Sequence, residues 1–398
     1  MIPLALDELR DLGKLAGGAA EVTGVQIDSR RVGPGDLFVA VGGGKAFLDD
    51  ACARGAAATL VPRDDFAAMA AIGGAVRSRM NARVVAITGS VGKTSTKDIL
   101  AALLRSSVRV VAAEEGFNNE IGLPLTLCRV EADTDVVITE MGMRGSGQIR
   151  ALAEIARPHI GVITSIAPVH LELLGSIENI ARAKAELLDY VEVGVVPEDC
   201  PELEPFVPAG LDIRRFATPD VEIRDGHAIV GGVEFDFSAR HQASNAAAAL
   251  ATVAALGLQA PAGRVEVQFS RWRSQETERP GGGLLINDAW NANPVAMRAA
   301  LAHLQDRAAG RRTVAILGEM AELGADAARF HQEIARALGS VDVVIGVGEH
   351  ARGYEPTAWA ATAAEALPLV DELVRPGDVV LVKGSRSVGL EVIAEALA

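Results

Sequence analysis

Short, continuous apolar runs alternate with turns and helical patterns along most of the chain. Runs of this kind are typical of strands buried on both faces. Where they alternate with helical stretches, the pattern predicts βαβ units and parallel sheets. The predicted strands fall into three groups: 24–27, 36–41 and 57–61; 84–87, 136–139 and 160–164; 313–317, 341–345 and 379–382. Helices are predicted at 93–104, 147–156 and 243–256.

The three groups of strands predict an α/β protein of three domains. We place these at residues 1–80, 81–272 and 273–398, a size that suits folding domains. The first is a small α/β domain, the second a parallel-sheet domain and the third a Rossmann-like α/β domain. Each strand of the third group ends near a glycine, at Gly318, Gly346 and Gly384. Ligands bind beyond the carboxyl ends of parallel strands, so these loops are expected to face a cleft.

Composition narrows the class of protein. The chain is 49% apolar and 23% charged, as in an ordinary folded protein. Its net charge of −14 argues against nucleic acid as a partner, because a phosphate backbone needs a basic surface. Three widely spaced cysteines, without CxxC spacing, are expected to be buried thiols in a reducing compartment. With no apolar run long enough to span a bilayer, we expect a soluble, cytoplasmic protein.

The most specific motif follows the predicted strand 84–87. It comprises Thr88, Gly89, Ser90, Val91, Gly92, Lys93, Thr94 and Ser95, and a predicted helix follows it. A glycine-rich turn between a strand and a helix presents backbone amides and a positive helix end to phosphate. Lys93 would reach the β- and γ-phosphates of ATP, and the Thr94 hydroxyl would bind Mg²⁺. The general Walker pattern requires glycine where Ile87 stands, so an ordinary strand–turn–helix corner remains the alternative.

Three further side chains are candidates for metal binding. Glu140 directly follows the predicted strand 136–139, where a carboxylate can point into the phosphate site as a second Mg²⁺ ligand. His170 lies just past the predicted strand 160–164, on the same expected edge, and is as plausibly structural as functional. Composition alone favours an exposed helix position for Lys184.

The compact form of the phosphate loop resembles that of the Mur ligase and folylpolyglutamate synthetase family. The segments 140–142 (EMG), 170–172 (HLE) and 183–186 (AKAE) resemble the same family. The resemblance implies an ATP-dependent ligase in which Glu140 and His170 hold two Mg²⁺ ions. It also implies that Lys184 is carbamylated by CO₂ and supports the second metal ion.

Other segments resemble one branch of that family, which adds D-alanyl-D-alanine to UDP-MurNAc-tripeptide. They are 117–126 (FNNEIGLPLT), 287–294 (NDAWNANP), 317–324 (LGEMAELG) and 383–386 (KGSR), and Trp290 stands where tyrosine is usual. The resemblance implies a monomer with an N-terminal UDP-sugar-binding domain, a central ATPase domain and a C-terminal domain for the dipeptide. It assigns Asn245, Arg273 and Asn291 to ATP, and Ser29, Arg30, Asn118, Asn119, Asp288, Asn291 and Asn293 to the substrates.

Three alternative functions remain at this stage. The first is another ligase of the family that adds a different amino acid or glutamate, against which the NANP stretch speaks. The second is a phosphate-loop module that binds nucleotide without ligase chemistry. The third is a nicotinamide-dependent oxidoreductase, which lacks support because Gly346-Val347-Gly348 is not followed by the third glycine of GxGxxG.

Overall fold

The computed structural model describes residues 1–169 and 171–398. The N-terminal part of the protein holds a four-stranded and a two-stranded sheet. Of the three cysteines, Cys128 and Cys200 are buried, but Cys52 is exposed, so the expectation of three buried thiols was wrong. The short helix α1 (Leu48–Ala53) buries only Ala51 and leaves Cys52 on its outer face. In the two-stranded sheet, β1 (Leu4–Ala5) pairs with β3 (Glu21–Val22). The strand order of the four-stranded sheet is β2 (Gly13–Gly17), β6 (Ala58–Pro62), β5 (Asp36–Val39) and β4 (Gly24–Gln26). The helices are α1 (Leu48–Ala53) and α2 (Asp65–Arg79).

The central part is built on a six-stranded, fully parallel sheet. Alternate residues of β7 (Arg83–Thr88) face opposite sides of the sheet. Val84 packs towards α5 (Gln148–Ala156), and Val85 packs towards α3 (Lys93–Leu104) and α8 (Gln242–Ala255). Both faces are therefore covered, as the continuous apolar runs predict. The strand order is β12 (Asp212–Phe216), β11 (Val193–Pro197), β10 (Ile160–Ile163), β7 (Arg83–Thr88), β9 (Val136–Glu140) and β8 (Val110–Ala112). The helices are α3 (Lys93–Leu104), α4 (Gly122–Leu127), α5 (Gln148–Ala156), α6 (Leu171–Leu174), α7 (Ile177–Ala185) and α8 (Gln242–Ala255).

A small four-stranded sheet lies beside this central unit, and its residues share one apolar core with α3 and α8. Its strands are β13 (Glu222–Arg224), β14 (His227–Val230), β15 (Val233–Phe235) and β16 (Arg264–Val265).

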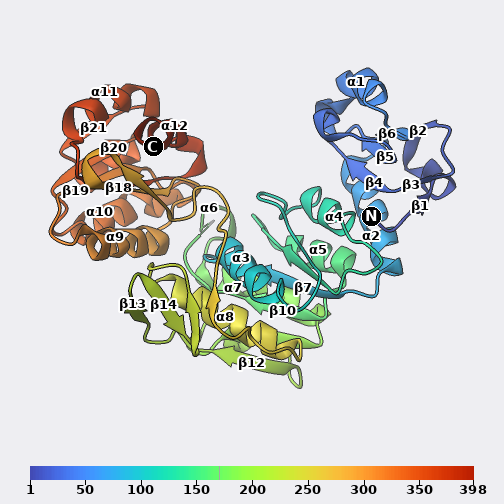
Figure 1. Ribbon diagram of the computed structural model, residues 1–398, viewed down its shortest axis with the longest axis horizontal. Coiled ribbons are helices and arrows are strands. Elements are labelled where there is room, and N and C mark those ends of the chain that lie inside the picture. Colours follow the sequence, from blue (N-terminus) through green and yellow to red (C-terminus); the bar gives the residue numbers. More distant parts are fainter. Residues whose placement is uncertain (170) are drawn as a thin grey trace.

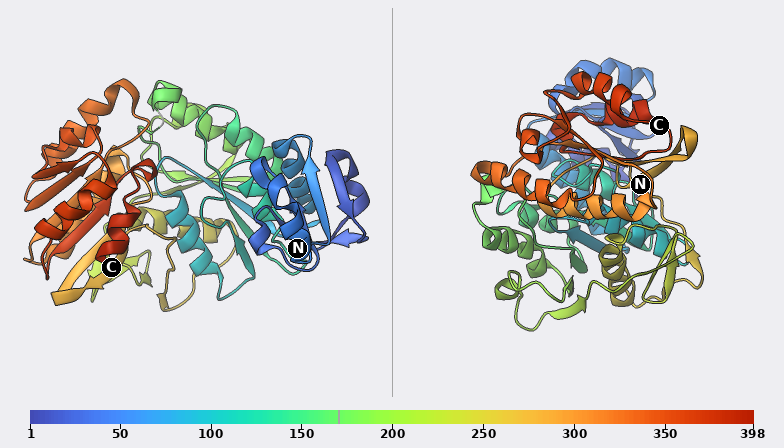
Figure 2. Two further views of the ribbon diagram at one scale, coloured as in Figure 1. Left: turned by 90° about the horizontal axis from the view of Figure 1, so that it is seen from above. Right: turned by 90° about the vertical axis from the view of Figure 1, so that its left-hand side faces the viewer.

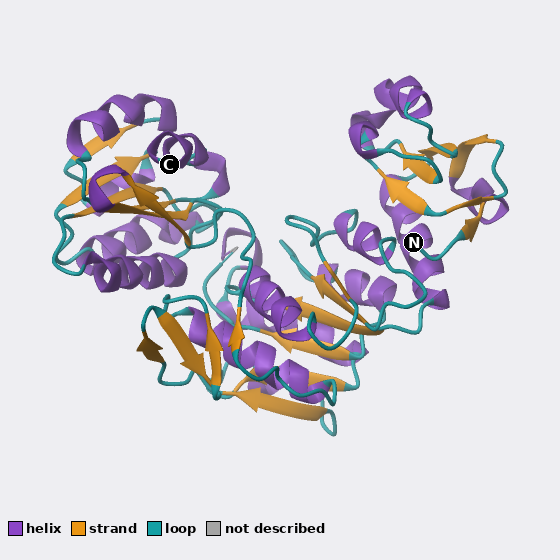
Figure 3. Ribbon diagram, viewed as in Figure 1, coloured by secondary structure: helices purple, strands orange, loops and turns teal. Residues whose placement is uncertain are grey.

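The C-terminal part is a second six-stranded sheet with helices on both faces (Figure 3). Its edge strand β17 is antiparallel to β18, and all other pairs are parallel. The strand order is β17 (Gln275–Arg279), β18 (Gly283–Asp288), β22 (Val379–Lys383), β19 (Thr313–Gly318), β20 (Val343–Val347) and β21 (Ala358–Ala360). The helices are α9 (Pro294–Ala308) and α10 (Ala327–Ala337) on one face, and α11 (Ala363–Leu373) and α12 (Glu391–Leu397) on the other.

The N- and C-terminal parts stand at opposite ends of the central sheet (Figures 1 and 2). Helix α2 belongs to the first part but shares one apolar core with α4 and α5 of the central part. Arg77 on α2 donates to the carbonyl oxygens of Ala156 and Arg157 at the end of α5, at 2.6 and 2.7 Å. This helix therefore ties the two parts together.

Candidate active site

The phosphate loop joins β7 to α3 in a conformation that requires glycine. Gly89 and Gly92 have φ values of 145° and 88°, a region that side chains disfavour. A Cβ at Gly89 would collide with Thr164, and one at Gly92 would collide with Asn245. The loop is thus closed against the residues after β10 and against α8, with its amides at the start of α3. An ordinary corner that merely contains GKT does not need this packing.

Glu140 lies directly beside this loop because β9 pairs with β7 in parallel register, with Glu140 opposite Ile87. Its carboxylate is 7% exposed and accepts hydrogen bonds from Thr94 Oγ1 at 2.9 Å and Asn118 Nδ2 at 3.0 Å. Burial favours the neutral acid, but Lys93 and the hydrogen bond from Asn118 outweigh it and hold the pKa of Glu140 below its ordinary value. The site therefore contains a buried, charged carboxylate next to a threonine hydroxyl.

Two lysines converge on one carbonyl oxygen of the loop. Lys93 Nζ donates to Gly89 O at 2.9 Å, and Lys184 Nζ donates to the same atom at 3.0 Å. Lys184, on α7, is only 2% exposed, so the expectation of an exposed helix lysine was wrong. Burial, and then the charge of Lys93, lowers the pKa of Lys184 well below its ordinary value. Burial at this position thus destabilises the charged ammonium form of Lys184.

A cavity of about 700 Å³ lies between the central and C-terminal parts, and most of the predicted site residues line it. Thr88 and Gly89 are not in its wall: Thr88 is buried beneath the loop, where its hydroxyl donates to Met141 O at 2.9 Å. The candidate ligand His170 lies outside the described residues. The predicted residues in the wall are Ser90, Val91, Gly92, Lys93, Thr94, Ser95, Asn118, Asn119, Glu140, Lys184, Asn245, Arg273, Asp288, Asn291 and Asn293.

The C-terminal wall of the cavity is held by charge and by helix capping. Asp288 at the end of β18 pairs with Lys383 at the end of β22, with Nζ and Oδ2 2.6 Å apart. Lys383 also donates to Asn291 O at 2.8 Å. Asn293 accepts from Ala296 N at 2.9 Å and caps α9, which Pro294 begins. The NANP motif thus has a structural use, the start of a helix at the cavity edge.

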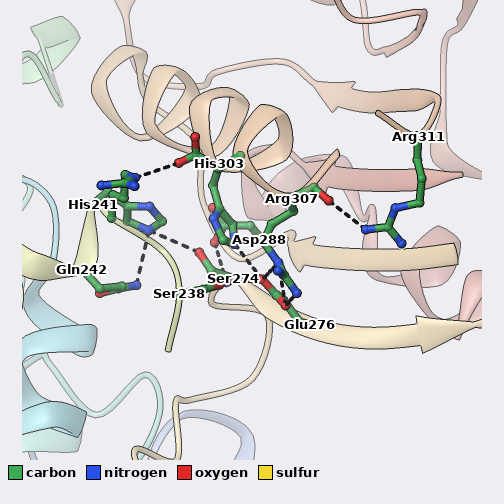
Figure 4. A network of polar contacts seen from close by, with 11 residues as sticks. Ser238, His241, Gln242, Ser274, Glu276, Asp288, His303, Arg307 and Arg311 are labelled. Atoms are coloured by element: carbon green, nitrogen blue, oxygen red, sulfur yellow. Dashed lines mark hydrogen bonds and ion pairs between the residues drawn. The ribbon is translucent and has the colours of Figure 1, made fainter. Parts of the chain in front are cut away.

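Polar contacts connect the central and C-terminal parts beside the cavity (Figure 4). His241, at the start of α8, lies 3.4 Å from Ser274 Oγ and packs edge-on against His303 of α9. Glu276 of β17 lies 2.8 Å from His303 Nε2 and pairs with Arg307 at 2.9 Å. Burial is the main cause that lowers the pKa of His241 to about 4. A neutral histidine therefore lies in the interface between these two parts.

Ser29 and Arg30 lie on the N-terminal part and do not line this cavity. The guanidinium of Arg30 is 80% exposed and is held by Asp28, with Nη2 2.7 Å from Oδ2. Asp28 also caps the short helix 29–31 by accepting from Arg30 N at 3.0 Å, and the Arg30 hydrogen bonds lower its pKa to about 2. The side chain of Asn119 accepts a hydrogen bond from Gly122 N, the first residue of α4, at 2.9 Å.

Several residues of the cavity wall were missed in the sequence. Thr164 and Ser165 hydrogen-bond the phosphate loop, and Thr164 Oγ1 donates to Val91 O at 2.6 Å. Their place directly after β10, beside β7, was a usable signal, since parallel strands end at one edge. Arg144 and Gln148 also line the cavity, but they follow β9 at a distance that no local pattern reveals.

The comparisons with known proteins agree with this geometry. Residues 87–253 match the Mur ligase middle domain, and residues 272–386 match the Mur ligase, glutamate ligase domain. A UDP-N-acetylmuramoyl-tripeptide--D-alanyl-D-alanine ligase of Mycobacterium leprae is 34% identical over 98% of this chain and 95% of its own. The ligase of the same name from Escherichia coli is 30% identical over 100% of this chain and 99% of its own.

Two solved structures extend the match to three dimensions. MurF from Acinetobacter baumannii has a TM-score of 0.83 and 25% identity, covering 99% of this chain and 98% of its own. MurF from Thermotoga maritima in complex with ADP has a TM-score of 0.79 and 25% identity, covering 94% and 96%. Family domains, full-length relatives and overall fold coincide with the phosphate loop and its buried carboxylate. The chain belongs to the Mur ligase family.

Proposed function

We propose that this protein joins D-alanyl-D-alanine to UDP-MurNAc-tripeptide at the expense of ATP, giving the pentapeptide precursor of peptidoglycan. The observation that carries the proposal is that one cavity holds the phosphate loop on one wall and the NDAWNANP segment on the other. Relatives that match the chain over nearly its whole length are ligases of this name. We assign residues 1–80 to the UDP-sugar, 81–272 to ATP and 273–398 to the dipeptide.

The ATP site lies at the phosphate loop. The amides of Gly92 and of the first residues of α3 would receive the phosphate oxygens, since a helix N-terminus favours negative charge. Lys93 would exchange its bond to Gly89 O for the phosphates. Asn245 and Asn291 would bind the nucleotide, and Arg273 would meet the phosphates from the side of the C-terminal domain.

Magnesium fits the donor set of this site. The hydroxyl of Thr94 and the charged carboxylate of Glu140 are adjacent hard oxygen ligands, the type that Mg²⁺ prefers. We assign one Mg²⁺ ion to these two residues and a second to Glu140 and His170 with carbamylated Lys184. When bound, the ions would neutralise charge on the phosphates during transfer.

A carbamate on Lys184 fits the buried amine. Carbamylation needs an uncharged amine as the nucleophile towards CO₂, and the site favours that form of Lys184. The reaction forms an N–C bond, releases one proton and leaves a negative group. The carbamate would place a negative charge beside Lys93 at Gly89 O, and the two groups would attract each other.

The ligation would proceed through an acyl phosphate. An oxygen of the tripeptide carboxylate attacks the γ-phosphorus of ATP, and ADP leaves. The amine of D-Ala-D-Ala then attacks the acyl carbon, phosphate leaves, and the amine loses its proton. Lys93 and Arg273 would stabilise charge on the transferring group. Closure of the cavity between the central and C-terminal domains would exclude water from the acyl phosphate.

The remaining substrate contacts are assigned to residues of all three domains. Arg30, beside Ser29, presents an exposed guanidinium suited to the diphosphate of the UDP-sugar. Asn118 and Asn119 would contact the peptide near the phosphate loop. Asp288, with Asn291 and Asn293, would receive the dipeptide. No described helix has the length and apolarity to cross a membrane. We expect a monomer that works in the cytoplasm.

The test is phosphate release from ATP with UDP-MurNAc-tripeptide and D-Ala-D-Ala, omitting one substrate at a time. Release should require both, and mass spectrometry should find the pentapeptide product. A panel of amino acids and glutamate in place of the dipeptide separates this proposal from other ligases of the family. Lys93→Ala should lose turnover and stay folded, whereas Lys14→Ala, an exposed lysine on β2, should keep it. Release without either substrate would contradict the proposal.

A further inference from the structure

Helix α3 carries a buried ion pair, one turn beyond the phosphate loop, that the proposed chemistry does not use. Lys97 Nζ lies 2.9 Å from Asp98 Oδ1, and the two side chains are 4% and 9% exposed. Burying two charges is costly unless further hydrogen bonds satisfy them. What these side chains bind therefore indicates why they are buried.

Both side chains bind the segment that leads into the C-terminal domain. Asp98 accepts a hydrogen bond from Ser270 N at 2.8 Å through Oδ2, and from Ser270 Oγ at 3.3 Å through Oδ1. Lys97 Nζ donates to Ala113 O at 2.9 Å and lies 3.4 Å from Ser270 Oγ. Ser270 is thus fastened to the phosphate-loop helix through its backbone and its hydroxyl.

Three residues after Ser270, the chain places Arg273 against the phosphate loop. Its Nη2 lies 3.4 Å from Thr94 Oγ1, and its guanidinium lies 5.5 Å from the centre of the Trp290 ring. Its Nε is buried and has no partner among the described residues. Such weak contacts place a long, charged side chain poorly, so its position depends on the backbone that carries it.

The backbone on either side of Arg273 is strained. Trp272 and Ser274 have φ values of 58° and 50°, in the left-handed region that residues with a side chain disfavour. Ser274 N donates to Asp288 Oδ1 at 3.2 Å, which fastens the far end of the segment to the C-terminal domain. The strained residues lie between two anchors: Ser270, which is bound to Asp98 of α3, and Ser274, which is bound to Asp288 at the end of β18. A rotation of one domain against the other must change the backbone between these anchors.

We propose that Asp98 is a positioning residue for the ligation reaction. By holding Ser270 on α3, it keeps Arg273 aligned with Lys93 and Thr94 of the same helix. The phosphate loop and the arginine then form one unit, and the rest of the C-terminal domain turns about the backbone between Arg273 and Ser274 without displacing the arginine. This inference rests on the proposed function, in which Arg273 meets the ATP phosphates.

The test is a double-mutant cycle between Asp98→Ala and Arg273→Ala. Asp98→Ala alone should weaken ATP binding and lower kcat/KM for ATP by roughly tenfold or more, the size expected when a buried charged partner is lost. In the Arg273→Ala background the same change should alter ATP binding and kcat/KM less than about twofold. Asp98 is proposed to act on ATP only through Arg273, so its replacement has little further effect once the arginine is gone. If Asp98 had only a structural role, the fold-changes of the two single variants in ATP binding and in kcat/KM would multiply in the double variant.

Asp342 supplies the matched control. It accepts from Thr313 N at 2.7 Å and Thr313 Oγ1 at 2.9 Å, the same pattern of bonds, at the amino end of β19. Asp342→Ala should leave ATP binding unchanged and show no coupling to Arg273. If Asp98→Ala does not fold, as thermal melting will show, Lys97→Met/Asp98→Leu leaves no unpaired buried charge and no acceptor for Ser270, and it serves in the same cycle.

ATP binding is measured by calorimetry without the other substrates, so the cycle does not depend on ligation. A wild-type protein that binds ATP but does not make the pentapeptide would contradict the proposed function and leave this cycle readable. Multiplying effects of Asp98→Ala and Arg273→Ala, or near-normal ATP binding by Asp98→Ala in a protein that ligates, would overturn the role of Asp98.

Discussion

Replacing Gly92 by alanine tests the geometry of the phosphate loop against a matched position in the same domain. Gly92 and Gly147 both precede a helix as left-handed caps, with φ of 88° and 82°. A Cβ at Gly147 meets nothing within 4 Å, whereas one at Gly92 collides with the Asn245 side chain. The backbone strain of alanine is thus equal in the two variants, but only Gly92→Ala also collides with the Asn245 side chain.

The expected magnitudes follow from these contacts. Alanine in the left-handed region costs about 1 kcal/mol, so Gly147→Ala should lower the free energy of unfolding by about that amount. Gly92→Ala should lower it by about 2–3 kcal/mol, because displacing Asn245 also breaks its 2.7 Å bond to Gln242, worth about 1 kcal/mol. ATP binding should weaken in Gly92→Ala and stay unchanged in Gly147→Ala.

Urea unfolding of both variants, with and without ATP, measures these differences. The wild type and Gly147→Ala should gain the same stability from saturating ATP, and Gly92→Ala should gain less, since only a bound ligand stabilises the folded state. Equal losses of stability in the two variants, or normal stabilisation of Gly92→Ala by ATP, would refute the reasoning.

Three further predictions concern the titratable groups. Glu140→Gln keeps the shape of the side chain but removes its charge, so turnover should fall roughly 100-fold or more and require higher Mg²⁺; unchanged Mg²⁺ dependence in a kinetic titration would contradict this. Lys184→Met should change the free energy of unfolding in urea by less than about 1.5 kcal/mol, since the site favours an uncharged group, while abolishing ligation. The unfolded chain protonates His241 near pH 6.5 and the folded one only near 4, so this residue should make stability fall as the pH drops through that window, by up to about 3 kcal/mol. In His241→Gln the pH dependence of urea unfolding should be shallower by that amount, and identical curves would exclude the histidine as the cause.

Local patterns carried the prediction wherever the physical cause was local. The strand before the phosphate loop and the helix after it occupy Arg83–Thr88 and Lys93–Leu104, as the apolar run and the glycines predict. Glu140 ends a buried strand, which places it at the carboxyl edge of any parallel sheet. In contrast, α2 was missed, because exposed apolar residues such as Phe66, Ala67 and Ala71 lie outside its buried stripe and blur the helical pattern in the sequence.

The class of fold, the phosphate loop and the carboxylate beside it could be predicted from the order of the amino acids, because backbone conformation and strand periodicity depend on neighbouring residues. Which polar side chains share a site depends on how segments far apart in the chain pack against each other. The sequence places Lys184 on a helix, but its burial beside Gly89 comes from how α7 packs below the loop. The pairing of Asp98 with Ser270, 172 positions apart, likewise exists only after the sheet has brought both segments together.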